Sequence, residues 1–180
     1  YRHALTGLAN RRYFDMQLQQ MLASDDEFHT GALLLVELKE FKTFNERRGY
    51  TAGDELLRGT VAVINEVVLA EAGLDCFVAH LAGASFALVI ANVSETEAIE
   101  FGQRLAAALA QLQQRGLVDN ADVGHVGMAI YRRQSASQFL SEADTALRAA
   151  QNKGPNALHV HVDCGVAVVA WSATRWSEFL

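Results

Sequence analysis

Apolar and polar positions along the chain form blocks that predict helices alternating with strands. A continuous apolar run of strand length occurs at 32–36, and further strands are predicted at 123–131, which is apolar with two glycines, and at 158–162. Helices are predicted at 11–23, 40–48, 52–71, 95–114 and 136–152. Two further apolar runs lie within 77–90. The predicted order is helix, strand, helix, helix, strand, strand, helix, strand, helix, strand, which is typical of helices packed around a mixed sheet.

Capping signals mark where three of these helices begin. In each, a serine or threonine stands three residues before an acid or an amide: Thr51 and Asp54, Ser94 and Glu97, Ser135 and Gln138. The sequence therefore predicts side-chain caps for the helices at 52–71, 95–114 and 136–152.

The residues between 77 and 90 are two apolar runs separated by the small residues Ala82-Gly83-Ala84-Ser85. Two strand-length runs around a short glycine-containing break predict a β-hairpin. The break carries one hydroxyl group and no carboxylate, base or charge. We therefore expect a hairpin at the centre of the domain that has lost a reaction rather than kept one.

Composition and charge narrow the class of protein. The chain has 180 residues, of which 51% are hydrophobic, and this suits one folded domain with a short appendage. Its net charge of -6 and its scattered basic pairs argue against a nucleic-acid partner. Cys76 and Cys164 are too few for a disulfide framework, so we expect reduced thiols in a cytoplasmic setting. Nothing basic flanks Cys76, which favours a structural role for it.

The two ends of the chain suggest a fragment of a longer protein. No apolar stretch reaches the roughly 18 residues of a membrane span, and no signal peptide is present. The chain starts at Tyr1 without an initiator methionine, and residues 164–180 are apolar with Trp171 and Trp176 among them. These aromatic residues either fold back on the domain or begin the next one. We expect 1–163 to form the domain and 164–180 to lead into a following domain, with any membrane anchor outside this chain.

Six ordered motifs resemble the signature of the GGDEF domain, the diguanylate cyclase fold. They are Leu5-Thr6-Gly7-Leu8-x-Asn10-Arg11-Arg12, Phe41-Lys42-x-x-Asn45, Gly49-x-x-x-Gly53-Asp54-x-Leu56-Leu57, the hairpin, Ala143-Asp144-x-Ala146-Leu147 and Gly154-x-Asn156. The resemblance covers residues 3–163. It implies an α/β (α+β) fold of the palm-like nucleotide cyclase type, with a central mixed sheet of about five strands and the signature hairpin at 77–90.

The resemblance also says what the family's reaction needs. GGDEF cyclases join two GTP molecules, held by two subunits, into cyclic di-GMP with the help of metal ions. The signature Gly-Gly-Asp/Glu-Glu-Phe reads Ala82-Gly83-Ala84-Ser85-Phe86 here, so Ala84 replaces the metal-binding carboxylate and Ser85 its acidic neighbour. The other metal carboxylate falls on Glu37, a vestigial metal position. The second acid of that strand end is Lys39, whose charge would repel a cation.

Two further sets of ligands are missing by the same resemblance. The Lys and Arg that hold phosphates fall on Gln151 and Pro155. The Arg and Asp of the product-inhibition site fall on Gly73 and Cys76. We therefore expect no cyclase activity, no bound metal, no cofactor and no inhibitory site.

The pair that reads guanine in the family survives as Asn45 and Asp54, a vestigial nucleotide-binding pair. An alternative is that both are structural, Asn45 by satisfying local backbone and Asp54 by capping the helix after Gly53. Guanine contacts without a grip on metal or phosphate would bind weakly, which favours the structural alternative.

Three histidines give weaker signals. His159 and His161 alternate on one predicted strand and could face the same side as metal ligands, but with no third ligand in view we expect a solvent-facing pair. His80 enters the hairpin at a position where the family often carries Arg. Packing or a hydrogen bond is a simpler role for it than catalysis.

These observations predict a catalytically inactive GGDEF domain that acts as a regulatory, signal-relay or protein-interaction module. The segments 10–18 and 154–157 resemble most the LapD type of cyclic di-GMP receptor, in which GGDEF and EAL domains are linked. The resemblance implies a cytoplasmic domain of an inner-membrane protein, with a linked EAL domain, other GGDEF proteins or a dimer mate as partners. Cyclic di-GMP would be bound by the full-length protein rather than by this chain.

Two alternatives to the inactive module stay open. The first is a GTP-binding allosteric sensor that controls a linked EAL phosphodiesterase through Asn45 and Asp54. The second is an atypical active cyclase, which Ala84 and Lys39 oppose.

Overall fold

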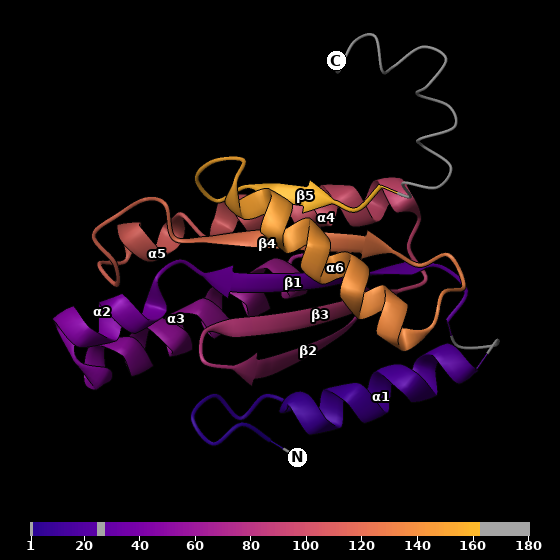
Figure 1. Cartoon of the computed structure of the whole chain (residues 1–180), viewed down its shortest axis with the longest axis horizontal. Helices are drawn as coiled ribbons and strands as arrows, with labels where there is room; N and C mark the ends of the chain where they lie inside the picture. The colour runs from indigo at the N-terminus through magenta and orange to yellow at the C-terminus, as the bar shows by residue number, and fades with distance from the viewer. Residues whose placement is uncertain (1, 25–27, 163–180) are drawn as a thin grey trace, which may run out of the picture.

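The computed structural model describes residues 2–24 and 28–162, which form a five-stranded mixed sheet with helices on both faces (Figure 1). The strands are β1 (Gly31–Leu38), β2 (Asp75–Ala82), β3 (Ser85–Ala91), β4 (Gly124–Ile130) and β5 (Leu158–Val160). The helices are α1 (Arg11–Ala23), α2 (Phe41–Arg48), α3 (Tyr50–Leu69), α4 (Glu95–Ala108), α5 (Gln111–Gln114) and α6 (Ala136–Gln151). The predicted element order and the palm-like sheet are confirmed, with one predicted helix divided into α4 and α5.

β1 is the central strand of the sheet, in the spatial order β2-β3-β1-β4-β5. It pairs antiparallel with β3 on one side and with β4 on the other, and β5 lies parallel to β4. Its burial on both faces follows from its continuous apolar sequence. Glu37, near its end, is opposite Ser85 of β3 and His125 of β4. The end of β1 therefore lies between the hairpin and the start of β4.

β2 and β3 form the predicted hairpin, which is slightly longer than the sequence indicated and runs from Asp75 to Ala91. A register shift, as at a β-bulge, interrupts the pairing of β2 with β3 between His80 and Ala82, just before the tip of the hairpin. Figure 1 shows the hairpin turn, the end of β1 and the start of β4 at the same end of the sheet, close to α2. This end is where the candidate site residues gather.

Two apolar cores cover the two faces of the sheet. Leu34 and Val36 of β1 point into the core beneath α3 and α4, and the alternating Leu33 and Leu35 point into the core beneath α1 and α6. Burial of each such side chain stabilises the fold by about 1.5–3 kcal/mol. This burial fixes α6, which carries part of the site, against the sheet.

The start of α3 differs from the prediction. Gly49, with φ of 89°, both ends α2 and serves as N-cap of α3, which begins at Tyr50 without a side-chain cap. The first main-chain bond of α3 runs from the Gly53 amide to the Gly49 carbonyl (3.1 Å). Thr51 and Asp54 are therefore inside the helix and do not cap it, because glycine joins the two helices with no linker between them.

Side-chain caps are present at the start of the other two helices, as predicted. Ser94 and Glu97 form a complete capping box, with bonds of 3.1 and 2.9 Å. Ser135 accepts the Gln138 amide (3.1 Å), but the Gln138 side chain turns to Glu142 instead of returning to the cap. Half of the second box is therefore present.

The helix predicted at 95–114 is interrupted after Ala108. The amides of Leu109 and Ala110 bond to carbonyls three residues back, at 3.3 Å each, which tightens the chain into a turn. Leu109 and Leu112 are both fully buried. The turn thus lets side chains on either side of it enter the same core.

The C-terminal part of the chain ends in a short strand. β5 covers Leu158–Val160 of the predicted 158–162, and the His161 amide still donates to the Met128 carbonyl (2.7 Å). The predicted lead-in at 164–180 and Cys164 lie outside the described residues. Within the described part of the chain, no helix has the length and apolar content needed to cross a membrane.

Candidate functional site

The turn of the signature hairpin is held by main-chain contacts and by burial. Gly83 has φ of 52°, a conformation that glycine adopts without strain. The Ala84 carbonyl accepts a hydrogen bond from the Leu38 amide (3.0 Å), and the Ala84 methyl group is buried at 7% exposure. Ala84, the position of the family's metal-binding carboxylate, is therefore packed into the core beside the end of β1.

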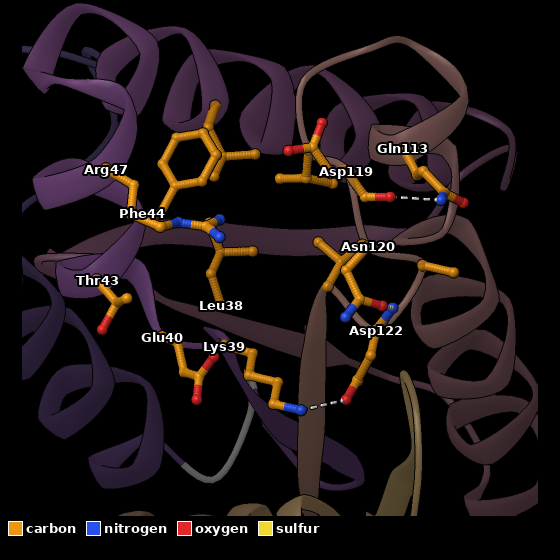
Figure 2. A pocket seen from close by; sticks show the side chains of 14 residues that line it. Leu38, Lys39, Glu40, Thr43, Phe44, Arg47, Gln113, Asp119, Asn120 and Asp122 are labelled. Atoms are coloured by element: carbon orange, nitrogen blue, oxygen red, sulfur yellow. Dashed lines mark hydrogen bonds and ion pairs between the residues drawn. The ribbon is translucent and has the colours of Figure 1, made fainter.

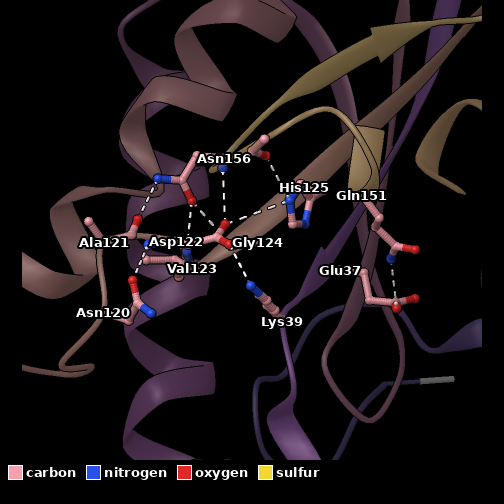
Figure 3. Close-up of polar contacts among 11 residues, drawn as sticks. Glu37, Lys39, Asn120, Ala121, Asp122, Val123, Gly124, His125, Gln151 and Asn156 are labelled. Atoms are coloured by element: carbon pink, nitrogen blue, oxygen red, sulfur yellow. Dashed lines mark hydrogen bonds and ion pairs between the residues drawn. The ribbon is translucent and has the colours of Figure 1, made fainter. Parts of the chain in front are cut away.

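Glu37 is engaged by side chains from two other elements. The Gln151 amide of α6 donates to its Oε1 atom (3.1 Å), and the Ser85 hydroxyl lies 3.5 Å from its Oε2 atom. The Arg148 guanidinium lies 3.8 Å from Oε1. Figure 3 shows Gln151 directed at Glu37. The structure thus brings together Glu37, Ser85 and Gln151, three positions that the sequence singled out.

Lys39 is paired with an acid that the sequence analysis missed. Its ammonium group donates to Asp122 at 2.6 Å, and this hydrogen bond raises the pKa of Lys39. Burial works against the ionised form of Asp122, but Lys39 and the Asn156 amide more than offset it and lower the pKa of the carboxyl group. The repulsion of a cation that the sequence suggested for Lys39 is therefore offset by Asp122.

A pocket of 640 Å³ opens beside this ion pair, between α2 and the loop that precedes β4 (Figure 2). Leu38, Phe44 and Val123 are among its apolar lining residues. Figure 2 shows Lys39 bonded to Asp122 along one side of the pocket. The Lys39 side chain therefore lines this pocket, while Glu37 lines a different one.

The second pocket, of 470 Å³, lies between the hairpin and α6. Its lining includes acidic, basic and hydroxyl side chains from the hairpin and three helices or strands: Arg11, Glu37, Ser85, Ser137, Ser141, Asp144 and Arg148. The basic groups here are already paired, Arg11 with Asp15 and Arg148 with Asp144 and Glu37. Of the positions that the resemblance assigns to the catalytic apparatus, Glu37 and Ser85 line this cleft.

Asn156 holds the loop after α6 against the start of β4, a role that its place in the Gly154-x-Asn156 motif did not predict. Its Oδ1 atom accepts the amides of Val123 (2.8 Å) and Gly124 (3.2 Å), and its Nδ2 group donates to the Ala121 carbonyl (2.6 Å), as Figure 3 shows. Its φ of 50° is tolerated by asparagine. The available signal was an asparagine after Gly-Pro, a residue that bonds readily to nearby backbone.

Pro155 lies within this loop, and neither it nor Gln151 offers a cationic group. The His125 ring is 4% exposed, and its Nε2 atom is 3.0 Å from the Gly154 carbonyl on the other side of the proline. The loop that would carry the family's phosphate-binding Arg is thus fixed by Asn156 and His125.

Asn45 and Asp54 do not have the structural roles proposed for them. Among the described residues, the buried Oδ1 atom of Asn45 has no hydrogen-bond partner, so it does not satisfy local backbone. Asp54 lies inside α3 and does not cap it. A Cβ atom on Gly53 would stand 1.8 Å from Asn45 Oδ1, so α2 and α3 meet in close contact at this glycine. Neither Asn45 nor Asp54 lines the two pockets described above.

The two positions of the family's product-inhibition site, Gly73 and Cys76, carry no charged side chain. Gly73 lines a cavity of 290 Å³, in which Arg104 is bonded to Glu71. Cys76 lies nearby on β2, and burial, with a smaller effect of Asp75, raises the pKa of its thiol to about 12. The thiol therefore stays protonated at neutral pH, in agreement with a structural role.

The remaining histidines are not gathered into a metal site. Burial lowers the pKa of His159, and the charges of Lys153 and His161 lower it further. Across residues 2–24 and 28–162 no group of three or more His, Cys, Asp or Glu side chains could hold a metal ion. His80 is fully buried and packed between rings, so the packing role predicted for it is confirmed.

Comparisons with known proteins agree with this arrangement. Residues 1–157 match the family model of the diguanylate cyclase GGDEF domain. The cyclic di-GMP phosphodiesterase PdeB of Shewanella oneidensis is 32% identical over 165 residues, which cover 88% of this chain and 18% of PdeB. The RNase E specificity factor CsrD of Escherichia coli is 24% identical over 160 residues, which cover 88% of this chain and 24% of CsrD. The chain thus spans less than two thirds of these curated relatives.

Solved structures share the fold at low sequence identity. The isolated GGDEF domain of TpbB (YfiN) from Pseudomonas aeruginosa superposes with a TM-score of 0.75 at 22% identity, covering 94% of this chain and 99% of that one. The S helix-GGDEF-EAL part of Vibrio cholerae LapD, bound to c-di-GMP, gives a TM-score of 0.72 at 22% identity, covering 89% of this chain and 37% of that one. On the match of the family model and on this shared architecture, the chain belongs to the GGDEF domain family.

Proposed function

We propose that this chain is a catalytically inactive GGDEF domain that relays signals or docks partners within a larger protein. The observation that carries the proposal is the state of Glu37, whose carboxylate accepts protein donors from α6 and faces the hairpin. In an active cyclase this carboxylate would be free to bind a metal ion. Here its oxygens are occupied from within the fold.

The donor set around Glu37 does not fit a divalent cation. Mg²⁺ is held by carboxylate oxygens, and the second carboxylate position is the methyl group of Ala84, which is buried. Ser85 and Gln151 bring neutral donors that already bond to Glu37, and Arg148 brings a positive charge within 3.8 Å. A cation would have to displace these contacts and would then have the carboxylate of Glu37 as its single acidic ligand from these positions.

The two positions at which the family carries its phosphate-binding Lys and Arg hold no cation in this chain. The side-chain amide of Gln151 already donates a hydrogen bond to Glu37, and Pro155 has neither a side-chain nor a main-chain hydrogen-bond donor. Charge stabilisation by fixed cations is the main contribution that proteins make to phosphoryl transfer. This supports a domain that does not catalyse the cyclase reaction.

The relatives support a place beside other domains. PdeB is named a cyclic di-GMP phosphodiesterase, CsrD an RNase E specificity factor, and LapD was solved with GGDEF and EAL domains in one chain. We propose a linked EAL domain, beginning beyond residues 164–180, as the first partner of this chain, on the cytoplasmic side of an inner-membrane protein. In that arrangement the full-length protein, as in LapD-type receptors, binds cyclic di-GMP.

The test measures product formation and metal binding separately. We expect no cyclic di-GMP from GTP with Mg²⁺ or Mn²⁺, with the diguanylate cyclase TpbB of Pseudomonas aeruginosa as the positive control; product made by this chain would overturn the proposal. Electron paramagnetic resonance should detect no bound Mn²⁺ in the chain and weak binding after Ala84→Glu. The matched control is Ala82→Glu, at an exposed position of the same turn, which should not bind Mn²⁺.

A second candidate function, a GTP sensor, is favoured by one observation. The unpartnered, buried Oδ1 atom of Asn45 is costly unless a ligand or water donates to it, by about 1–3 kcal/mol. Guanine offers such donors, and Asp54 follows the glycine that contacts Asn45. Binding of the base alone could then bias a linked domain.

Calorimetric titration of GTP, with and without Mg²⁺, decides between the two candidates. The sensor requires binding that Asn45→Ala and Asp54→Ala each abolish and that Glu46→Ala, an exposed neighbour on α2, does not. The relay module requires no GTP binding. A separate titration with cyclic di-GMP tests the expectation that this chain alone does not bind it.

A further inference from the structure

His80 stands between the N-terminal segment, defined here as residues 2–10, and the turn of the signature hairpin. It projects from β2 and is 0% exposed. Its ring stacks on His3 at a centroid distance of 3.7 Å and on Phe86 at 4.5 Å. An imidazole is thus enclosed between a ring of the N-terminal segment and a ring of the hairpin.

Both nitrogens of the His80 ring are bonded, and the partners fix its tautomer. Nε2 lies 2.7 Å from the Gly83 carbonyl, which can only accept, so Nε2 carries a proton. Nδ1 lies 3.1 Å from the Thr6 hydroxyl, which donates to it when the ring is neutral. One neutral ring therefore links Thr6 to the carbonyl of the turn glycine.

Main-chain contacts also join the N-terminal segment to β2. The His80 amide donates to the Ala9 carbonyl (2.9 Å), and Ala9 forms a parallel bridge with Ala79. The N-terminal segment is itself closed by bonds from the His3 amide to Leu8 (2.7 Å) and from the Gly7 amide to His3 (2.9 Å). It therefore contacts the hairpin as a folded unit, and α1 follows it directly.

We propose that His80 is a joint that couples the N-terminal segment to the signature turn, and that the joint opens when the His80 ring becomes charged. Proton uptake on Nδ1 of His80 turns the Thr6 hydroxyl from donor into acceptor and places a charge at a fully buried position. A charge on His3 then repels it at stacking distance. The repulsion separates the N-terminal segment from the His80 ring, while the Gly83 carbonyl, whose bond to Nε2 favours the charged ring, holds that ring at the turn.

The charged surroundings of His80 support this direction of the response. Burial lowers the pKa of His80, the bond to Gly83 opposes this, and His3 lowers it further. Arg2, the other basic group of the N-terminal segment, is bonded to the Gly7 carbonyl (2.7 Å), and Phe86 and Gly83 bring no charge. Because the pKa is lowered by folding, the joint is fully formed above about pH 6.5 and weakens as the pH falls below that value.

This inference rests on the proposed relay function only for its biological use, because a relay needs a contact that passes a change from one segment to another. The joint is a property of the folded chain. A cyclase assay that overturned the relay proposal would leave it standing, and the spectroscopic test below does not depend on activity.

The test is a proton and nitrogen NMR titration of the chain between about pH 8 and about pH 5, with the His80 ring and the Gly83 and Ala9 amides as reporters. We expect the three signals to shift with one midpoint. Thr6→Val should lower the hydrogen-exchange protection of the His80 amide roughly fivefold at neutral pH and move the Gly83 signal. Thr96→Val, an exposed position on α4, is the matched control and should do neither.

Two results would overturn the joint. One is a Gly83 signal that does not follow the His80 titration, and the other is a Thr6→Val chain whose Gly83 signal is unchanged. His3→Phe separates stacking from charge, because it keeps an aromatic ring and removes the coulombic effect of His3 on His80. The His80 midpoint should then move to higher pH, and an unchanged midpoint would contradict the role given to His3.

Discussion

The side chain of Gln151 on α6 donates a hydrogen bond to the carboxylate of Glu37 on β1, over 3.1 Å and 114 positions of sequence. The resemblance assigned the first position to a phosphate ligand and the second to a metal ligand. In this fold the two residues bind each other. Two side chains that the resemblance assigns to different ligands thus satisfy each other.

Replacing Gln151 tests how much this contact stabilises. Gln151→Ala should lower the free energy of unfolding by about 1 kcal/mol, because the bond is charge-assisted but Glu37 is one third exposed. Urea unfolding at neutral pH measures this. Gln103→Ala, which truncates an exposed glutamine of α4, serves as the matched control; an equal loss there would show that the effect belongs to the loss of a helical glutamine and not to the contact with Glu37.

The acid stability of the domain should depend on Asp122. Its pKa is lower in the fold than in the unfolded chain, so the stabilisation is complete above about pH 4 and is lost as the pH falls through the folded value. Asp122→Asn should unfold more easily at neutral pH and flatten the acid limb of the stability curve. Urea midpoints measured from neutral pH downwards follow both effects.

Asp15→Asn is the control for this series. Asp15 forms an exposed pair with Arg11 one helical turn away, at 44% exposure, and such pairs contribute little. The acid limb of this variant should match that of the unchanged chain. A matching acid limb for Asp122→Asn as well would contradict the role of the Lys39–Asp122 pair.

Gly127 should be intolerant of any side chain. A Cβ atom there would lie 2.2 Å from the Leu147 amide nitrogen and 2.5 Å from the Ala143 carbonyl oxygen, and backbone of α6 cannot move aside cheaply. Gly127→Ala should cost more than about 3 kcal/mol or prevent folding. In Gly59→Ala the new atom meets only the end of Leu117, at 2.3 Å, so a near-neutral effect is expected in thermal melts.

Asn156 should be the most sensitive polar residue of the loop after α6. Asn156→Ala removes three side-chain hydrogen bonds and leaves φ of 50° to a residue that disfavours it, so a loss of about 2–4 kcal/mol is expected. Asn156→Gly relieves the backbone strain but not the lost bonds. An alanine variant as stable as the glycine variant would rule out a contribution from the backbone conformation.

Local patterns in the sequence predicted most of the helices and strands. The central strand was recognisable from five consecutive apolar residues, and the Ser94 cap from its partner Glu97. The start of α3 was misplaced because Thr51 and Asp54 have capping chemistry, whereas Gly49 makes the helix junction by its conformation. A side chain that can cap is visible in a sequence, but the backbone angle that makes a cap unnecessary is not.

The positions of the candidate site were predictable, and their partners were not. The family resemblance assigned Glu37, Ser85 and Gln151 to one site, and the fold brings them together. Lys39 was expected to act on that site, but its partner Asp122 comes from a loop with no motif of its own. Contacts between residues 83 positions apart depend on strand order, which a linear pattern leaves open.

The hairpin turn keeps its shape through the Leu38 amide, the Ala84 carbonyl and a buried methyl group. None of these contacts requires an acidic side chain at positions 84 or 85. Architecture and chemistry are thus separable at this turn, and the acids that make a cyclase could be exchanged for alanine and serine while the strands stayed in register. The residues at positions 84 and 85 can therefore decide whether such a domain is a cyclase while the fold around them stays the same.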